Sequence, residues 1–413
     1  MFGKLKNQIT RLFRRRKNAS GFIFHVDSPK ELADFLKPSI TFSGWIVSLT
    51  NEEISEGRIV ITEPNTSIDL KFCKPPGVEH DFPGHPCAGF SRILSPIQIC
   101  SVDAVRIEFR LGAVNKCHEI KVDTESIKKT ATGLAGRKKE KLERIKDYLI
   151  CPSCRSEQLS HNGYGIECTR CKSCYSSSDQ SYNFLSREMI NHGNIEATEN
   201  VSANDYDSIS QSIIERLPEG LILEIGCGLR SVYYPNVINF EIVDYPTTDV
   251  LGIGERLPFK SDTFDAVFSL NVFEHLRNPF ESASEIMRVL KPGGELYVTA
   301  PFLQPFHGYP NHYYNMTAKG LENLFGGMID IQEQGVPLSG SPIWALNWIL
   351  NYYCKGLPKD VVEKFRNMKV KHLTRPINTL LEKDYVNSLD PGVREELACT
   401  NYIVAKKKGE PDR

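Results

Sequence analysis

The sequence predicts an α/β protein with a doubly wound parallel sheet, preceded by a small β-rich sandwich domain and a cysteine-rich segment. Three observations support this fold class. From residue 205 onward, helix-like and strand-like segments alternate, as they do in βα units. Residues 21–125 contain short β-branched and aromatic runs separated by Pro, Gly and Asn, which is typical of a sandwich. Between these two regions, residues 150–186 contain two CxxC pairs.

Composition restricts the class of protein further. A chain of 413 residues exceeds one ordinary core, so we expect two or three domains. The 50 basic and 51 acidic residues nearly cancel, which argues against a protein that coats nucleic acid through bulk charge. No apolar run reaches the roughly 18–20 residues that span a bilayer. Five of the 12 cysteines crowd into one short segment, which favours a metal site in a reducing compartment and hence a cytoplasmic protein.

The first segment, residues 1–20, is a basic amphipathic tail. It carries seven Lys and Arg residues and no acid, and Phe2, Leu5, Ile9 and Leu12 recur at helical spacing. Such a helix fits an anionic membrane surface, so residues 1–17 are a candidate peripheral contact with the inner face of a membrane. A frayed, solvated tail remains the alternative.

Two segments separate the tail from the cysteines. Residues 21–125 read as the sandwich-like module, with strands expected in "SITFSGWIVSL", "EGRIVIT" and "AVRIEFRLG". The motifs "HVDSPKE", "FSGWIV" and "HDFPGHPCAGF" loosely resemble β-sandwich modules fused to bacterial glycan-synthesis enzymes. Residues 126–149 read as a charged helical linker with Leu142, Ile145 and Leu149 on one side.

The cysteine segment, residues 150–186, predicts a structural zinc site. Cys151-x2-Cys154 and Cys168-x2-Cys171 can direct four thiolates at one point, and such a closed shell leaves no position for water. Cys174 is a spare thiol that could replace Cys171. The segment resembles the small zinc ribbons of tRNA-methyltransferase activators, which pair a "CPxC" with a later "CxxC" and an aromatic residue, here Tyr175.

The stretch "LILEIGCGLRSVYY" predicts the cofactor loop. A dinucleotide site would have a third glycine where Ser231 stands, so NAD is the weaker candidate. S-adenosylmethionine has no phosphate and needs close backbone approach, which Gly226 and Gly228 permit. Glu224, at the end of the expected strand, can supply negative charge near its ammonium and sulfonium groups.

From Asp205 to Lys407 the chain resembles the class I S-adenosylmethionine-dependent methyltransferases, whose sheet is Rossmann-like. The likeness rests on four stretches in the family's order: "LEIGCG", "GERLPFKSDTFDAVFSLNVFEHL", "RVLKPGGELYV" and the terminal strand "TNYIVAKK". The stretch "PFLQPFHGYPNHYYNMTAKGLENLF" resembles a branch that often accompanies glycan-assembly enzymes. Residues 336–391 are an insertion before the last strand.

The resemblance implies roles for individual residues. Glu224, Gly226 and Gly228 would hold the methionine end of the cofactor. Glu241, or Asp244 if the strand runs longer, would accept the ribose hydroxyls, and Asn271 would lie near the amino or sulfonium group. Where the family has an acid for the adenine amino group this chain has Ile253, so backbone groups around Gly254, or Glu255, would replace that contact.

The segment after the fifth strand is expected to face the acceptor. His307, and next His312, are candidate general bases, because a neutral imidazole can take a hydroxyl proton near pH 7. Either one could instead pack or cap a loop, and His275 could be structural or line the pocket. The apolar helix expected in "SPIWALNWILNYY" could close the core, cover the acceptor site or touch a lipid surface.

These inferences predict an O-methyltransferase of polysaccharide biosynthesis that acts on a sugar or glycan, including a lipid-linked one. One alternative is an RNA base methyltransferase with an RNA-binding ribbon, although the near-neutral charge makes nucleic acid an unexpected partner. The other is a non-catalytic scaffold with a vestigial cofactor fold, which the absent acid at Ile253 would favour.

Overall fold

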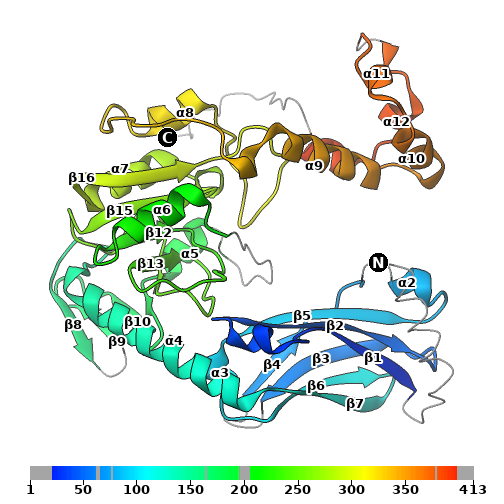
Figure 1. Ribbon diagram of the computed structural model, residues 1–413, viewed down its shortest axis with the longest axis horizontal. Coiled ribbons are helices and arrows are strands. Elements are labelled where there is room, and N and C mark those ends of the chain that lie inside the picture. Colours follow the sequence, from blue (N-terminus) through cyan, green and yellow to red (C-terminus); the bar gives the residue numbers. More distant parts are fainter. Residues whose placement is uncertain are drawn as a thin grey trace, which may run out of the picture.

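The computed structural model describes residues 21–61, 66–75, 78–162, 165–193, 195, 205–376 and 379–397. The tail at residues 1–20 and the predicted terminal strand in "TNYIVAKK" lie outside the described residues. Three regions follow one another along the chain, namely a pair of antiparallel sheets, a long helix and a nine-stranded mixed sheet (Figure 1). This arrangement confirms the predicted fold class.

Two antiparallel sheets face each other at the N-terminal end. Apolar side chains from both sheets, among them Phe42, Ile46, Ile107 and Phe109, are buried in one shared core. In β6 every second residue is buried, because successive side chains of a strand point to opposite faces. The first sheet has the order β1 (Phe22–Ser28), β2 (Ile40–Ser48), β5 (Cys87–Leu94) and the second the order β4 (Thr66–Leu70), β3 (Ile54–Ile61), β6 (Ala104–Leu111), β7 (Val114–Lys121); the short helices are η1 (Leu32–Leu36), α2 (Val78–Asp81) and α3 (Pro96–Ile99).

A single long helix, α4 (Thr124–Ile145), connects the sandwich to the larger sheet. The Asp123 side chain caps it by accepting from the Ser126 N–H at 3.0 Å. Ile127 near its start is buried in the sandwich core, whereas Leu142 and Ile145 near its end are buried in the core of the larger sheet. The predicted linker helix therefore contributes to both cores, and η2 (Lys146–Tyr148) follows it.

The larger sheet joins the cysteine segment to the α/β region. Its strand order is β16-β15-β12-β13-β14-β11-β10-β9-β8. The cysteine segment supplies β8 (Leu159–Asn162), β9 (Gly165–Cys168), β10 (Cys174–Ser177) and β11 (Tyr182–Asn183), and β11 pairs in parallel with β14 (Val250–Leu251). The sequence did not predict this continuity, because a two-residue strand carries no periodic signal.

The strand order of the α/β region changes direction at β12 (Ile222–Ile225), the first of its strands in the sequence. The chain adds β13 (Val237–Glu241) and β14 on one side of β12, and then β15 (Phe264–Leu270) and β16 (Leu290–Thr299) on the other. Ligands of doubly wound sheets bind at such a switch point, beyond the carboxyl ends of the strands. The helices and turns of this region are α5 (Arg187–Gly193), α6 (Ser208–Arg216), η3 (Phe273–His275), α7 (Pro279–Val289) and α8 (Ala318–Leu324).

The predicted insertion forms helices that project from the sheet region (Figure 1). They are η4 (Leu338–Gly340), α9 (Pro342–Lys355), α10 (Lys359–Arg366), α11 (Val370–Leu373), α12 (Asp384–Asn387) and α13 (Pro391–Glu396). No residue of α9 is buried, so the interpretation that this helix closes the core is wrong. Among the described residues, no helix combines the length and apolar character that crossing a membrane requires.

Candidate functional site

A cavity of about 1260 Å³ lies at the switch point of the sheet. Its walls include Gly226 after β12, Glu241 at the end of β13 and Asn271 after β15. The other wall is formed by the loop after β16 and by α9. The cavity thus connects the predicted cofactor loop with the segment expected to face the acceptor.

The glycine loop has the conformation that close ligand approach needs. Gly226 and Gly228 have φ angles of +64° and +60°, in the left-handed region that side chains with a Cβ disfavour. A Cβ on Gly226 would lie 2.5 Å from Cγ2 of Val272, so this backbone can line the cavity only as glycine. Gly228 does not itself line the cavity. Its N–H donates to Oε2 of Glu241 at 2.7 Å.

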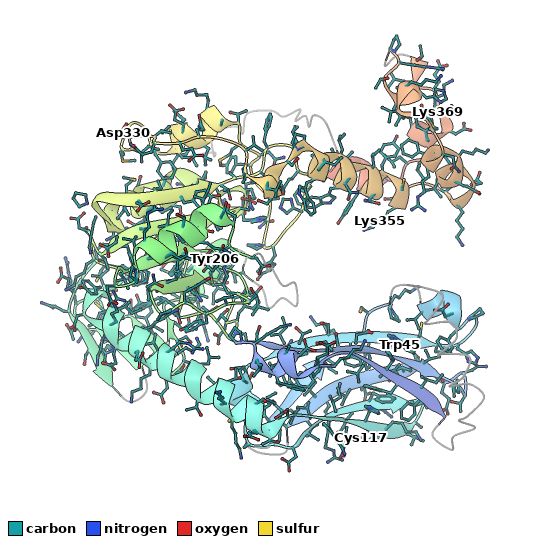
Figure 2. The ribbon with its side chains drawn as sticks, viewed as in Figure 1. Trp45, Cys117, Tyr206, Asp330, Lys355 and Lys369 are labelled. Carbon is teal, nitrogen blue, oxygen red and sulfur yellow. The ribbon has the colours of Figure 1, made fainter. Side chains whose placement is uncertain are left out.

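Glu224 lies behind this loop and does not line the cavity. Its carboxylate is completely buried, accepts from Nε of Arg230 at 3.0 Å and from the Tyr206 hydroxyl at 2.5 Å, and also pairs with Nη2 of Arg230. Burial raises the pKa of Glu224, and the Arg230 guanidinium acts in the opposite direction. Tyr206 lies beside the sheet (Figure 2). The predicted direct contact of Glu224 with a cofactor stays a prediction, because its negative charge is already paired.

Glu241 does line the cavity, and its backbone neighbours orient it. Besides the Gly228 N–H, the Ile242 N–H donates to its Oε1 at 2.8 Å. Burial raises the pKa of Glu241, whereas these backbone donors lower it. The alternative acid, Asp244, is not among the residues that line the cavity.

The remaining predicted cofactor residues meet at the same wall. Ile253, Gly254 and Glu255 follow β14 and all line the cavity. Asn271 adopts a φ of +56°, and its N–H donates to the Thr299 carbonyl at 3.0 Å. Together with the backbone at Gly226 and the carboxylate of Glu241, these groups fit a cofactor that has an adenosine part and a charged amino-acid part.

Three ionisable side chains converge at the end of the cavity that the loop after β16 and α9 form. Glu274 and His275 lie on η3, and His307 lies on the loop after β16. Oε1 of Glu274 is 3.7 Å from Nε2 of His275 and 3.9 Å from Nε2 of His307. Burial raises the pKa of Glu274 to about 8 and lowers that of His275 to about 4, and burial also lowers the pKa of His307. Both imidazoles are therefore neutral near pH 7.

His312 occupies a different position from His307. Its Nδ1 accepts from the His307 N–H at 3.1 Å, and its Nε2 lies 2.8 Å from Oδ1 of Asn315. Both ring nitrogens are used within the loop, and His312 does not line the cavity. His307 lines it with Nε2 unbonded, so it remains the predicted base, whereas the geometry of His312 matches a loop-packing role.

Aromatic rings enclose the same end of the cavity. Tyr309 and Tyr313 come from the loop, and Trp344 and Trp348 come from α9. The rings of Trp348 and His307 are 5.0 Å apart. The α9 helix therefore covers this end of the cavity, and the interpretation that it covers an acceptor site stays a prediction.

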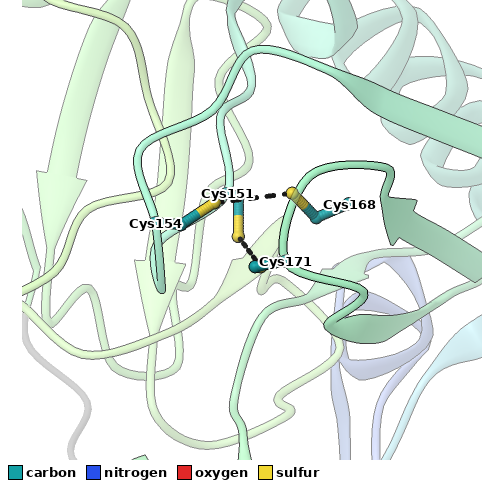
Figure 3. A group of neighbouring side chains, drawn as sticks. All are labelled: Cys151, Cys154, Cys168 and Cys171. Atoms are coloured by element: carbon teal, nitrogen blue, oxygen red, sulfur yellow. Dashed lines mark hydrogen bonds between the residues drawn. The ribbon is translucent and has the colours of Figure 1, made fainter.

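The four predicted zinc ligands form a separate cluster (Figure 3). The sulfurs of Cys151, Cys154, Cys168 and Cys171 all lie within 4.8 Å of one another. The Cys151–Cys171 and Cys154–Cys168 pairs are 3.5 Å apart, close to the roughly 3.8 Å that tetrahedral Zn–S bonds of about 2.3 Å require. Cys174 is exposed and lies outside the cluster. These residues fit a structural zinc ion.

Two residues of the site escaped the sequence analysis. Glu274 stands next to His275 in "FEHL", but a single sequence does not reveal that its carboxylate is buried. Arg230 stands directly before Ser231, which occupies the position of the third glycine. The acid at the end of the expected strand, Glu224, was the available signal that Arg230 has a partner.

Comparisons with known proteins identify part of this region. Residues 235–298 match the family model described as "Methyltransferase domain". A tRNA U34 carboxymethyltransferase of Cellvibrio japonicus is 35% identical over 19% of this chain and 32% of its own length. An uncharacterized methyltransferase of Mycobacterium tuberculosis is 38% identical over 20% of this chain and 30% of its own. The chain thus spans about a third of the length of these relatives.

Two solved structures are more distant. A complex between the Haloferax volcanii methyltransferase activator Trm112 and a methyltransferase has a TM-score of 0.24 and 16% identity, over 31% of this chain and 71% of that one. An S-adenosylmethionine-dependent methyltransferase of Thermotoga maritima has a TM-score of 0.22 and 23% identity, over 29% and 67%. Likenesses this low carry no inference about this chain.

The family match includes β13, β14 and β15, and its residues contribute Glu241, the 253–255 wall and Asn271 to the cavity. The C-terminal half of the chain therefore contains a class I S-adenosylmethionine-dependent methyltransferase domain, preceded by antiparallel β sheets and a four-cysteine cluster.

Proposed function

We propose that the chain transfers a methyl group to a hydroxyl of a sugar or glycan acceptor, a class that includes lipid-linked glycans. The observation that carries the proposal is the continuity of the cavity from the glycine loop to the His307 loop and α9. Its volume of about 1260 Å³ exceeds the roughly 300–1,000 Å³ of a pocket for one small molecule, so cofactor and acceptor can be held together.

S-adenosylmethionine, when bound, would supply an electrophilic methyl group. The backbone at Gly226 would let the cofactor approach closely, the Glu241 carboxylate would accept from the ribose hydroxyls, and Asn271 would lie near the methionine end. Nε2 of His307 faces the cavity from the acceptor side, where it can accept a hydrogen bond from the acceptor hydroxyl.

The lining of the acceptor side supports a sugar. Tyr309, Tyr313, Trp344 and Trp348 offer flat apolar surfaces on which a sugar ring can stack, and their polar tips can bond its hydroxyls. The resemblance of the His-Tyr loop and of the front module to glycan-associated proteins points the same way.

A tRNA is the second candidate acceptor, because one relative is a tRNA U34 carboxymethyltransferase. The charge of the cavity favours the glycan. Within the described part of the chain, its lining has five carboxylates and one guanidinium, that of Arg277, and a phosphate backbone needs cations around it. The carboxylates are Asp205, Asp207, Glu241, Glu255 and Glu274.

The test is transfer of radiolabelled methyl from S-adenosylmethionine into fractionated extract of the source organism, counting glycan, RNA and protein separately. We expect label in glycan. Gly226→Arg should abolish labelling and weaken cofactor binding at least 100-fold in calorimetry, because a Cβ there already meets Val272. Gly136→Arg is the matched control, since a side chain on that exposed helical glycine meets nothing within 4 Å.

Each other outcome has a definite meaning. Label in RNA would contradict the glycan proposal and would support an RNA acceptor. Absence of both label and cofactor binding in the wild-type protein would leave a scaffold with a vestigial cofactor fold.

A further inference from the structure

Glu274 is an unusual residue because its carboxylate is completely buried and lacks a hydrogen-bond partner. Neither Oε1 nor Oε2 has a donor within hydrogen-bond distance among the described residues. An ionised carboxylate in that state is strongly destabilising, so a protein that retains one usually provides a proton or a cation for it. The side chain is held at the cavity wall, where it can meet a ligand.

Two imidazoles present lone pairs to this carboxylate. Nδ1 of His275 lies 2.7 Å from the Asn311 carbonyl, and Nδ1 of His307 lies 2.8 Å from the Pro305 carbonyl. A carbonyl only accepts, so both Nδ1 atoms carry the proton and both Nε2 atoms have a free lone pair. In proteins, a histidine that binds a metal through Nε2 commonly donates a hydrogen bond from Nδ1–H to a backbone carbonyl, which orients the ring.

The backbone holds the three groups together. The Tyr313 N–H donates to the Glu274 carbonyl at 2.6 Å, which ties the His307 loop to η3. Gly308, at a φ of +93°, lies so close that a Cβ would be 2.1 Å from Cε1 of His275. Glycine at this position therefore allows the loop to bring His307 against the His275–Glu274 pair.

From this geometry we infer that Glu274, His275 and His307 form a binding site for one divalent transition-metal ion. Their donor atoms lie within 4.8 Å of one another, and Oε1 is 3.7 and 3.9 Å from the two Nε2 atoms. Ligand bonds of about 2.0–2.2 Å in a tetrahedral site need donors about 3.4 Å apart, a contraction of a few tenths of an ångström. Two imidazoles and one carboxylate suit ions such as Zn²⁺, Co²⁺ or Mn²⁺ and leave coordination positions open.

Glu274, His275 and His307 all line the cavity where the acceptor is proposed to bind, so the remaining coordination positions would be open to it. A hydroxyl coordinated to such an ion loses its proton at a much lower pH than a free one, and the proton passes to water at the mouth of the cavity. His307 then acts as a ligand that holds the ion, and the ion replaces the free imidazole as the group that activates the hydroxyl. This step rests on the proposed function, whereas the metal site itself does not.

The experiment is a metal count on the full-length chain. The protein is equilibrated with Zn²⁺, freed of unbound ion by gel filtration and analysed by mass spectrometry for zinc per chain. We expect two ions in the wild-type protein and one, in the cysteine cluster, in Glu274→Gln, which keeps the shape of the side chain but removes its charge. His307→Gln, on a partly exposed loop residue, should also bind one ion. His372→Gln is the matched control and should keep two, because His372 lies on α11, outside both groups of candidate ligands and outside the cavity lining.

Cobalt separates the two sites by spectrum. Co²⁺ bound by four thiolates gives intense sulfur-to-metal charge-transfer absorption, whereas Co²⁺ bound by nitrogen and oxygen gives only weaker visible bands. Glu274→Gln should lose the weaker bands alone, with at least tenfold weaker affinity. One ion in the wild-type protein, or two in every variant, would overturn the inference, and the first result would mean that Glu274 is neutralised by a proton.

The proposed function and the proposed metal site can each be rejected without rejecting the other. Methyl transfer to glycan by a protein that holds only the cluster zinc would retain the function and reject the metal site. A second ion bound by Glu274 in a protein that transfers no methyl group would do the reverse.

Discussion

At the scale of single residues, Glu241 offers the clearest test of cofactor binding. We expect Glu241→Gln to weaken S-adenosylmethionine about 10- to 100-fold, because a charge-assisted hydrogen bond contributes roughly 1.5–3 kcal/mol. The substitution also removes one of the two oxygens that hold the Gly228 and Ile242 N–H groups. The dissociation constant from calorimetry is the measurement.

Asp244→Asn is the matched control for that substitution. Asp244 lies three residues further on and does not line the cavity, so its loss should change the affinity less than threefold. Equal effects of the two substitutions would mean that the ribose contact belongs to the whole turn rather than to Glu241.

Residue types and spacing predicted several of the residues that line the cavity, but they could not predict how side chains pair. Gly226, Glu241 and Asn271 lie at or directly after the end of a strand, which a pattern of apolar runs can locate, and His307 lies in the loop that follows β16. Whether Glu224 faces a ligand or Arg230 depends on the direction of one side chain. That direction follows from packing around Tyr206, which no local spacing encodes.

At the scale of elements, the cysteine ribbon should influence the cofactor site through strand pairing. Tyr182 and Asn183 of β11 pair with Val250 and Leu251 of β14, and the next residues, Gly252 to Glu255, line the cavity. Cys168→Ser removes one of the four thiols that fit a structural zinc ion, and binding of that ion would stabilise the ribbon. We therefore expect a melting temperature lower by several degrees and weaker cofactor binding, measured by calorimetry on the same preparation.

Cys174→Ser is the control within the same element. Cys174 is exposed and stands outside the four-cysteine cluster, so both the melting temperature and the affinity should match those of the wild-type protein. A Cys168→Ser protein that melts earlier but binds the cofactor normally would show that the ribbon folds independently of the sheet edge.

Element type was predictable wherever the pattern was long, and contacts between elements were not. The apolar pattern of "SPIWALNWILNYY" predicted a helix, and α9 spans Pro342–Lys355. The same pattern favoured a core position because apolar faces are usually buried. Trp344 and Trp348 instead line a cavity. Their apolar side chains would therefore contribute to ligand binding rather than to the core.

At the scale of the whole molecule, two buried lysines of the long helix pair with Asp249 of the methyltransferase region, and Lys141 is the closer of the two. Nζ of Lys141 donates to Oδ2 of Asp249 at 2.9 Å, and both side chains are buried. Asp249 also accepts from the Tyr233 hydroxyl and from the Asn239 N–H. Nζ of Lys138, one helical turn earlier, donates to the carbonyls of Gln180 and Thr248.

This arrangement predicts that Lys141 contributes strongly to how firmly the sandwich is held to the α/β region. Lys141→Met should lower the free energy of unfolding by about 1.5–3 kcal/mol, because it removes the charged donor closest to Asp249 and leaves only Nζ of Lys138, 3.8 Å from Oδ1, to balance that carboxylate. Lys139→Met, on the exposed side of the same helix, should change it by less than about 0.5 kcal/mol. Denaturant unfolding gives both values, and limited proteolysis near residues 126–149 should cut the Lys141→Met protein faster. Equal stabilities would mean that Lys138 and the apolar contacts of Leu142 and Ile145 hold α4 without the ion pair.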